Sequence, residues 1–148
     1  MEEKNKYDRA TQDVGNLLAM EHVNVTVPDQ AVASTFYISG LGFTRDPYMM
    51  VGAGNMWVNV GQQQFHLPAS TPQVLSGKIG VVLPDLGALQ TRLKRVEKRL
   101  TGTKFKWSAN RNSVDVSCPW GNQFRCYQPS SQFGGMTPGL PYVEVSSD

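Results

Sequence analysis

Four side chains that could bind a metal ion or an anion stand at matching positions of two similar segments. His22 opens the segment His-Val-Asn-Val-Thr-Val-Pro-Asp, and Lys78 opens Lys-Ile-Gly-Val-Val-Leu-Pro-Asp, 56 positions later. His66 in Phe-His-Leu corresponds in the same way to Arg125 in Phe-Arg-Cys, 59 positions later. Imidazoles bind divalent transition metals, whereas a guanidinium stays protonated and binds anions. The sequence therefore offers two candidate metal ligands and two candidate anion-binding cations.

Strand periodicity predicts which side chains accompany these four. Alternate residues of a strand point to opposite faces of its sheet. The apolar set, expected beneath the helices, comprises Val23, Val25, Val27, Phe65, Leu67, Ile79, Val81, Leu83, Phe124 and Cys126. The opposite, polar set comprises His22, Asn24, Thr26, Gln64, His66, Lys78, Gly80, Gln123, Arg125 and Tyr127. The polar face predicts a solvated, concave surface large enough for a ligand. Asp115 is the acidic residue expected nearest to it, and the register of its strand decides whether its side chain lies on this face.

Each half of the chain has the same predicted order of elements, a strand, a helix and three further strands. In the first half the strand covers residues 22–27, Asp29 caps a helix that ends at Gly40, and strands follow near 43–49, 56–60 and 63–67. In the second half the strand covers 78–83, a helix follows Asp85, and strands lie near 104–107, 114–118 and 124–126. Neither half can bury its apolar face alone, so the two must share a core.

The remaining segments define the predicted domain limits. Residues 1–18 are predicted to be a flexible lead-in, and residues 19–130 a single domain with modules at about 20–68 and 77–129. Residues 131–148 are predicted to be a linker with an extra edge strand, or the start of a further module of a longer, four-module protein. As an edge strand, residues 142–145 could pair across a homodimer.

The motifs that define the repeat also resemble a known family. The runs His-Val-Asn-Val-Thr-Val-Pro-Asp, Phe-Tyr-x-x-Gly-Leu-Gly-Phe, Gln-Phe-His-Leu-Pro and Pro-Trp-Gly-Asn-Gln-Phe resemble the vicinal oxygen chelate superfamily over residues 20–129. This superfamily includes glyoxalases, extradiol dioxygenases and bleomycin-resistance proteins. The resemblance implies an α+β fold, in which two βαβββ modules form a curved mixed eight-stranded sheet around a central cavity, with the helices outside.

The resemblance also implies where a metal would bind. In metal-dependent members the ligands come from the slots that fall here on His22, His66, Lys78 and Arg125. His22 and His66 would suit one divalent ion of manganese, iron, nickel or zinc. A lysine and an arginine stand at the other two slots, so the metal site is degenerate.

Composition narrows the functional classes. The net charge of +2 gives too little excess to favour nucleic acid, and no apolar run approaches the roughly twenty residues of a membrane helix. The two cysteines, Cys118 and Cys126, form no disulfide framework, and we expect a cytoplasmic protein.

Two functions fit these observations. The first is a small-molecule-binding domain that holds an anionic or polar ligand between the modules, with Lys78, Arg125, Asn24, Gln64, Trp57 and Tyr127 as ligand-binding residues. The alternative is a divalent-metal-dependent lyase, isomerase or dioxygenase that uses His22 and His66 as metal ligands. The sequence leaves open whether the protein is an enzyme.

Overall fold

The computed structural model describes residues 19–49 and 54–147, so the predicted lead-in over residues 1–18 lies outside the described residues. The first module contains β1 (His22–Asn24), α2 (Gln30–Ser34), η1 (Thr35–Gly40), β2 (Thr44–Arg45), β3 (Asn55–Val60) and β4 (Gln63–Pro68). The second contains β5 (Gly77–Val82), α3 (Leu86–Val96), η2 (Glu97–Leu100), β6 (Lys106–Ala109), β7 (Ser113–Ser117) and β8 (Gln123–Tyr127). The chain continues with η3 (Ser131–Phe133) and β9 (Val143–Val145).

The two modules have the same strand order and the same register. β1 pairs in parallel with β4, and β5 pairs in parallel with β8. Asn24 lies opposite His66, and their repeat mates Gly80 and Arg125 lie opposite each other. Antiparallel strands then complete each sheet, in the orders β1-β4-β3-β2 and β5-β8-β7-β6. The predicted α+β fold with two βαβββ modules is confirmed.

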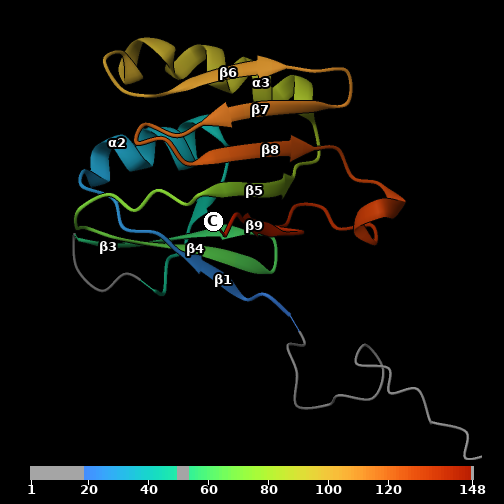
Figure 1. Cartoon of the computed structure of the whole chain (residues 1–148), viewed down its shortest axis with the longest axis horizontal. Helices are drawn as coiled ribbons and strands as arrows, with labels where there is room; N and C mark the ends of the chain where they lie inside the picture. The colour runs from blue at the N-terminus through green and yellow to red at the C-terminus, as the bar shows by residue number, and fades with distance from the viewer. Residues whose placement is uncertain (1–18, 50–53, 148) are drawn as a thin grey trace, which may run out of the picture.

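The strands do not form the single eight-stranded sheet that was predicted. They lie in one sheet of four strands and another of five, whose fifth strand is β9, paired with the outer edge of β5. Figure 1 shows β9 between β5 and the β1–β4 pair. The C-terminal residues therefore pair with a strand of their own chain.

Aspartates begin both long helical segments, as the Pro-Asp motifs predict. The Asp29 carboxylate accepts hydrogen bonds from the backbone N–H groups of Ala31 and Val32, at 2.8 and 2.9 Å. Asp85 accepts one from Ala88 at 2.9 Å. These bonds satisfy N–H groups that have no partner within the helix.

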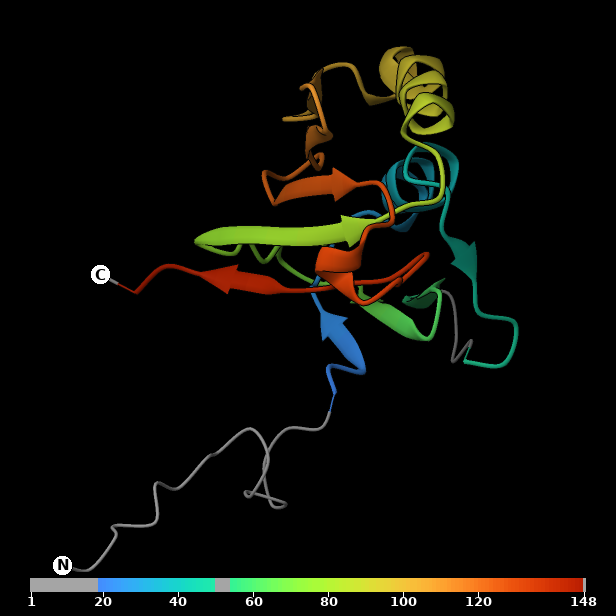
Figure 2. The same ribbon diagram turned by 90° about the vertical axis from the view of Figure 1, so that its right-hand side faces the viewer.

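The first helical segment ends at Gly40, as predicted, although its capping residue is Leu41 and not Gly40. The left-handed residue that follows the helix is Gly42, with φ of 84°. A Cβ atom at Gly40 would make an ordinary contact with Val96 of α3, at 3.5 Å. Arg92 of α3 also donates hydrogen bonds to the carbonyl oxygens of Gly40 and Leu41. Figure 2 shows the two helices on the same side of the sheets.

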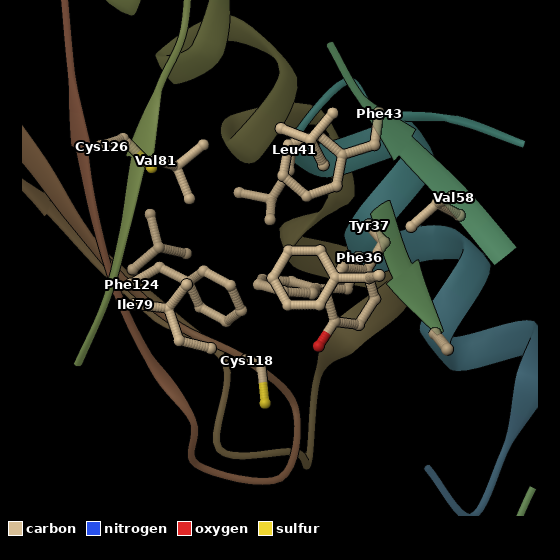
Figure 3. Packing of buried hydrophobic residues seen from close by; sticks show 14 of the residues in the cluster. Phe36, Tyr37, Leu41, Phe43, Val58, Ile79, Val81, Cys118, Phe124 and Cys126 are labelled. Atoms are coloured by element: carbon tan, nitrogen blue, oxygen red, sulfur yellow. The ribbon is translucent and has the colours of Figure 1, made fainter. Parts of the chain in front are cut away.

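The two modules share one hydrophobic core. All ten residues of the predicted apolar set are buried, each with 9% or less of its surface exposed. The rings of Phe65 and Phe124, which are repeat mates, lie 6.0 Å apart, and both contact Tyr37. Figure 3 shows this packing between helices and strands of both modules. No helix among the described residues is long and apolar enough to cross a membrane.

Candidate functional site

His22, Trp57 and His66 form a ring cluster on the polar face of the first sheet. Trp57 on β3 lies opposite His66 on β4, and their rings stack with centroids 4.1 Å apart and planes 12° apart. The ring of His22 on β1 meets Trp57 edge-on, at 5.2 Å. The His22 side chain is 37% exposed and Trp57 is half-buried, so the cluster is open to solvent. We call these three residues the imidazole–indole cluster.

His66 is held in place from two sides. Its Nε2 is hydrogen-bonded to Oδ1 of Asn55, while Trp57 covers its ring. Partial burial, and secondarily the nearby His22, lower the pKa of His66 below its usual value. Because its pKa is lowered, His66 is neutral at pH 7, and one of its ring nitrogens keeps a lone pair.

Amide side chains surround the imidazole–indole cluster. The side-chain amide of Gln64 donates to Oδ1 of Asn59 and to the carboxylate of Asp46, both at 2.8 Å. The backbone N–H groups of the residues that follow Asp46, together with these amides, lower the pKa of the Asp46 carboxyl. Asn24, opposite His66 on β1, is exposed. The face can thus offer both a π surface and hydrogen-bonding groups to a ligand.

Arg125 lies on the corresponding face of the second sheet and is paired with Asp115. Its Nε donates to Oδ1 of Asp115 at 2.7 Å, and its Nη2 donates to Oδ2 at 3.0 Å. This two-fold contact lowers the pKa of Asp115 and raises the pKa of Arg125. Because Asp115 neutralises the guanidinium, Arg125 is not the free anion-binding fork that the sequence suggested.

Tyr127 and Lys78 complete this second face. The Tyr127 hydroxyl lies 2.8 Å from the hydroxyl of Tyr142, whose ring packs against Gly80. Burial, and then the hydrogen bond to Tyr127, raise the pKa of Tyr142. Lys78 is half-buried on β5, and its charge helps to lower the pKa of Asp115.

The structure therefore gathers the predicted site residues into two groups, one on each sheet. Within the described residues, no hydrogen bond, ion pair or ring contact joins His22 or His66 to Lys78 or Arg125. A surface hollow of about 590 Å³ lies elsewhere, between residues 61–63 and residues 134–138, and contains no predicted site residue.

The donor set does not fit a resident divalent ion. Residues 19–49 and 54–147 contain no group of three or more His, Cys, Asp or Glu side chains that could hold a metal. Of the four slots implied by the resemblance, two carry imidazoles, one carries Lys78, and one carries a guanidinium paired with Asp115. Neither a protonated ammonium nor a guanidinium has a lone pair to donate.

Sequence reasoning missed several residues of these two groups. Asn55 and Asn59 could have been found, because they alternate with Trp57 along β3 and so share its face. Tyr142 left an indirect signal in Gly77 and Gly80, since glycine within a strand often marks the close approach of another chain segment. Asp46 left no signal, because it lies in a turn after the short strand β2.

The fold defines the class of protein to which this chain is comparable: it has the vicinal oxygen chelate fold of glyoxalases, bleomycin-resistance proteins and dioxygenases. One similar solved structure is a lactoylglutathione lyase from Agrobacterium tumefaciens, with 16% identity and a TM-score of 0.55, covering 81% of this chain and 99% of that one. Another is the antibiotic-binding protein TnmS3 from Streptomyces, with 21% identity and a TM-score of 0.54, covering 77% and 98%.

A third similar structure is a glyoxalase/bleomycin resistance protein/dioxygenase superfamily member from Sphaerobacter thermophilus. It has 21% identity and a TM-score of 0.50, covering 76% of this chain and 98% of that one. No family model and no curated protein matches this sequence. At these identities the similarity establishes the fold, and the function has to be argued from the site.

Proposed function

We propose that this chain is a small-molecule-binding domain whose ligand stacks on the imidazole–indole cluster of the first module. The observation that carries this proposal is the solvent-accessible stack of Trp57 on His66, with His22 at its edge. A large aromatic side chain on a polar, open face is a natural platform for a planar ligand. Because His66 covers one face of the indole, the ligand stacks on the opposite face.

The surrounding groups favour a polar ligand with a negative charge. Asn24 is exposed beside the cluster, and Gln64 is half-buried within the amide network of the same face. On the second sheet Asp115 neutralises Arg125, whereas Lys78 has no carboxylate within 4 Å among the described residues. Lys78 therefore keeps a positive charge on the second face, which favours a ligand that also carries an anionic group.

The chemistry of the side chains supports binding rather than metal-dependent catalysis. Two imidazoles are fewer protein ligands than the three that catalytic metal sites commonly use, and the other two slots carry a lysine and an arginine. Binding is also a known use of this fold, since TnmS3 is described as an antibiotic-binding protein.

The test is binding of a planar anion to wild type and to two tryptophan variants. Anthraquinone-2-carboxylate and 2-naphthoate serve as probes, followed by calorimetry and by quenching of tryptophan fluorescence. We expect Trp57→Leu to weaken binding about tenfold or more, because it removes the stacking surface. Trp107→Leu is the matched control, since this indole lies on β6 and donates to Glu97 instead.

Two results would contradict the proposal. The first is the absence of binding of both probes to wild type at about 1 mM, a concentration that detects even weak stacking sites. The second is an equal loss of affinity in Trp57→Leu and Trp107→Leu, which would indicate a general effect on the fold.

A further inference from the structure

Two glycines in β5 mark the place where the end of the chain approaches this strand. A Cβ atom at Gly77 would collide with the backbone carbonyl of Glu144, and one at Gly80 would lie 2.5 Å from the ring of Tyr142. Glycine within a strand costs stability, so its presence at both points suits a close approach. The approaching residues, 139–146, are called the C-terminal segment below.

The C-terminal segment is hydrogen-bonded along the edge of β5. The N–H of Gly80 donates to the carbonyl of Tyr142 at 3.0 Å, and the N–H of Val82 donates to the carbonyl of Gly139 at 2.8 Å. Between these bonds the Tyr142 ring lies over Gly80, and its hydroxyl reaches Tyr127. The segment thus places a phenol on the polar face of the second sheet.

The register places a carboxylate at the other end of the same surface. Lys78 lies directly opposite Glu144 in the β5–β9 ladder, and side chains of directly opposed residues lie on the same face. Tyr127 lies opposite Val82, so Lys78 and Tyr127 stand on either side of Gly80 along the strand. The segment therefore presents a phenol to Tyr127 and a carboxylate on the side of Lys78.

The first module has no such occupant among the residues described. Asn24, the repeat mate of Gly80, is exposed and carries its own side chain. At the equivalent point of the second face, Gly80 has no side chain, and the ring of Tyr142 covers its backbone. The two faces thus differ in what covers them as well as in charge.

We propose that Lys78, Gly80 and Tyr127 form a site for a hydroxyaryl carboxylate, in which the Tyr142 ring takes the place of the ligand's ring in this structure. The ring of such a ligand lies over Gly80, its hydroxyl bonds to Tyr127, and its carboxylate pairs with Lys78. The C-terminal segment and the ligand compete for this surface. This proposal rests on the proposed small-molecule-binding function and names a ligand class for its second face.

Release of Tyr142 requires only a local rearrangement. β9 has three residues, two of which are exposed, and such short edge elements open at low cost. The segment has a separate anchor at Leu140, which is buried and bonded to the side chain of Gln63. Residues beyond this anchor can leave β5 while Leu140 stays in the core, at the cost of the contact between Val143 and the core.

The test compares the binding of 4-hydroxybenzoate to wild type and to Tyr142→Ala by calorimetry. The variant removes the competing ring but keeps the β9 backbone, so we expect affinity to rise about tenfold, as for a site open in one tenth of molecules. Adding Lys78→Met should abolish this gain, and plain phenol should show a smaller one. Phe133→Ala is the control, because Phe133 also packs on Tyr127, at 4.9 Å.

Several outcomes would overturn the proposal: no gain in Tyr142→Ala, an equal gain in Phe133→Ala, a gain that survives Lys78→Met, or an equal gain for phenol. The last two would indicate a cavity without specific recognition. If Tyr142→Ala does not fold, hydrogen exchange of wild type decides. With about 10 mM 4-hydroxybenzoate the amide of Gly80 should exchange faster, and an unchanged rate would contradict the proposal.

These results are distinguishable from a failure of the proposed function. The proposed function is tested by the binding of polycyclic anions to wild type and to Trp57→Leu. The present proposal is tested by the binding of a single-ring ligand to variants of Tyr142 and Lys78. Loss of the first signal with retention of the second would overturn the stacking proposal alone.

Discussion

The ion pair between Arg125 and Asp115 determines the charge of the second face. Both side chains are about one third exposed, at 36% and 34%, so solvent screens their attraction. The main effect of this ion pair is to orient the side chains, because two parallel hydrogen bonds hold the guanidinium plane across β7 and β8. Lys78, which has no such carboxylate partner, can meet a ligand on this face.

This ion pair predicts a specific dependence of stability on pH. The pKa of Asp115 is lowered in the folded state, so its stabilising effect is full above the unfolded pKa of about 3.9 and is lost as pH falls through the lower, folded pKa. We expect wild type to lose more unfolding free energy than Asp115→Asn between about pH 5 and pH 2, by about 0.5–1 kcal/mol.

Urea unfolding of both proteins at each pH measures this difference. Asp46 and Glu97 also have lowered pKa values, but they are present in both proteins and cancel. The same loss in wild type and in Asp115→Asn would show that the ion pair contributes nothing measurable.

For single residues, the sequence predicted the face of the sheet on which a side chain lies better than the residues that it contacts. Parity placed His22, His66, Lys78 and Arg125 on the polar faces, and the structure has them there. It could not pair Arg125 with Asp115, because that contact depends on the register between β7 and β8, which a shift of one residue would reverse. For this reason the sequence predicted a free guanidinium at Arg125, whereas the structure has one that is paired with Asp115.

At the scale of elements, β9 distinguishes the second sheet from the first. Its ladder with β5 depends on Gly77, where any side chain would collide with the backbone of Glu144. Gly77→Ala should therefore detach the C-terminal segment or strain β5, at a cost of about 1–3 kcal/mol in unfolding free energy. Gly54→Ala is the control, because its Cβ atom would make an ordinary 3.5 Å contact with Ala69.

Chemical denaturation combined with hydrogen exchange at Gly80 checks this prediction. Faster exchange of the Gly80 amide in Gly77→Ala, but not in Gly54→Ala, is the expected pattern. Equal stability and equal exchange in both variants would mean that β9 does not depend on the bare backbone of β5.

The sequence could indicate that residues 142–145 are a strand, but not which edge they join. Their alternation is local, whereas their partner β5 lies more than sixty residues earlier. Both a neighbouring chain and a further module could have supplied that edge on sequence grounds. The long-range fit of Tyr142 over Gly80 appears only in three dimensions.

At the scale of the whole molecule, the shared core joins the two modules into one folding unit. Phe124 of the second module contacts Phe36, Tyr37 and Phe65 of the first. Neither sheet can lose this contact without exposing the aromatic core of the other. The modules should therefore unfold together.

Tryptophan fluorescence can test this cooperativity module by module. Trp57 reports on the first module, and Trp107 and Trp120 report on the second. We expect coincident urea midpoints for a variant that retains only Trp57 and for the Trp57→Phe variant. Separate midpoints would show that the modules unfold independently.

Phe124→Ala should lower the free energy of unfolding by about 3–5 kcal/mol, because it removes the ring that both modules share.

The repeat made the fold predictable, because matched motifs required two equivalent modules and one common core. Val25 and Val81, for example, were placed in that core by alternation alone and are fully buried. The arrangement of the polar faces was harder to predict. It depends on how the two sheets meet at the edge of β5, where the C-terminal segment intervenes.

The imidazole–indole cluster is proposed to bind its ligand without a metal ion. Calorimetry of anthraquinone-2-carboxylate should be run on protein treated with EDTA and on protein supplemented in turn with manganese, iron, nickel and zinc. We expect the same Kd in every case, with Trp57→Leu weakening binding about tenfold throughout. Binding that requires a divalent ion and disappears in His22→Ala and His66→Ala would contradict it.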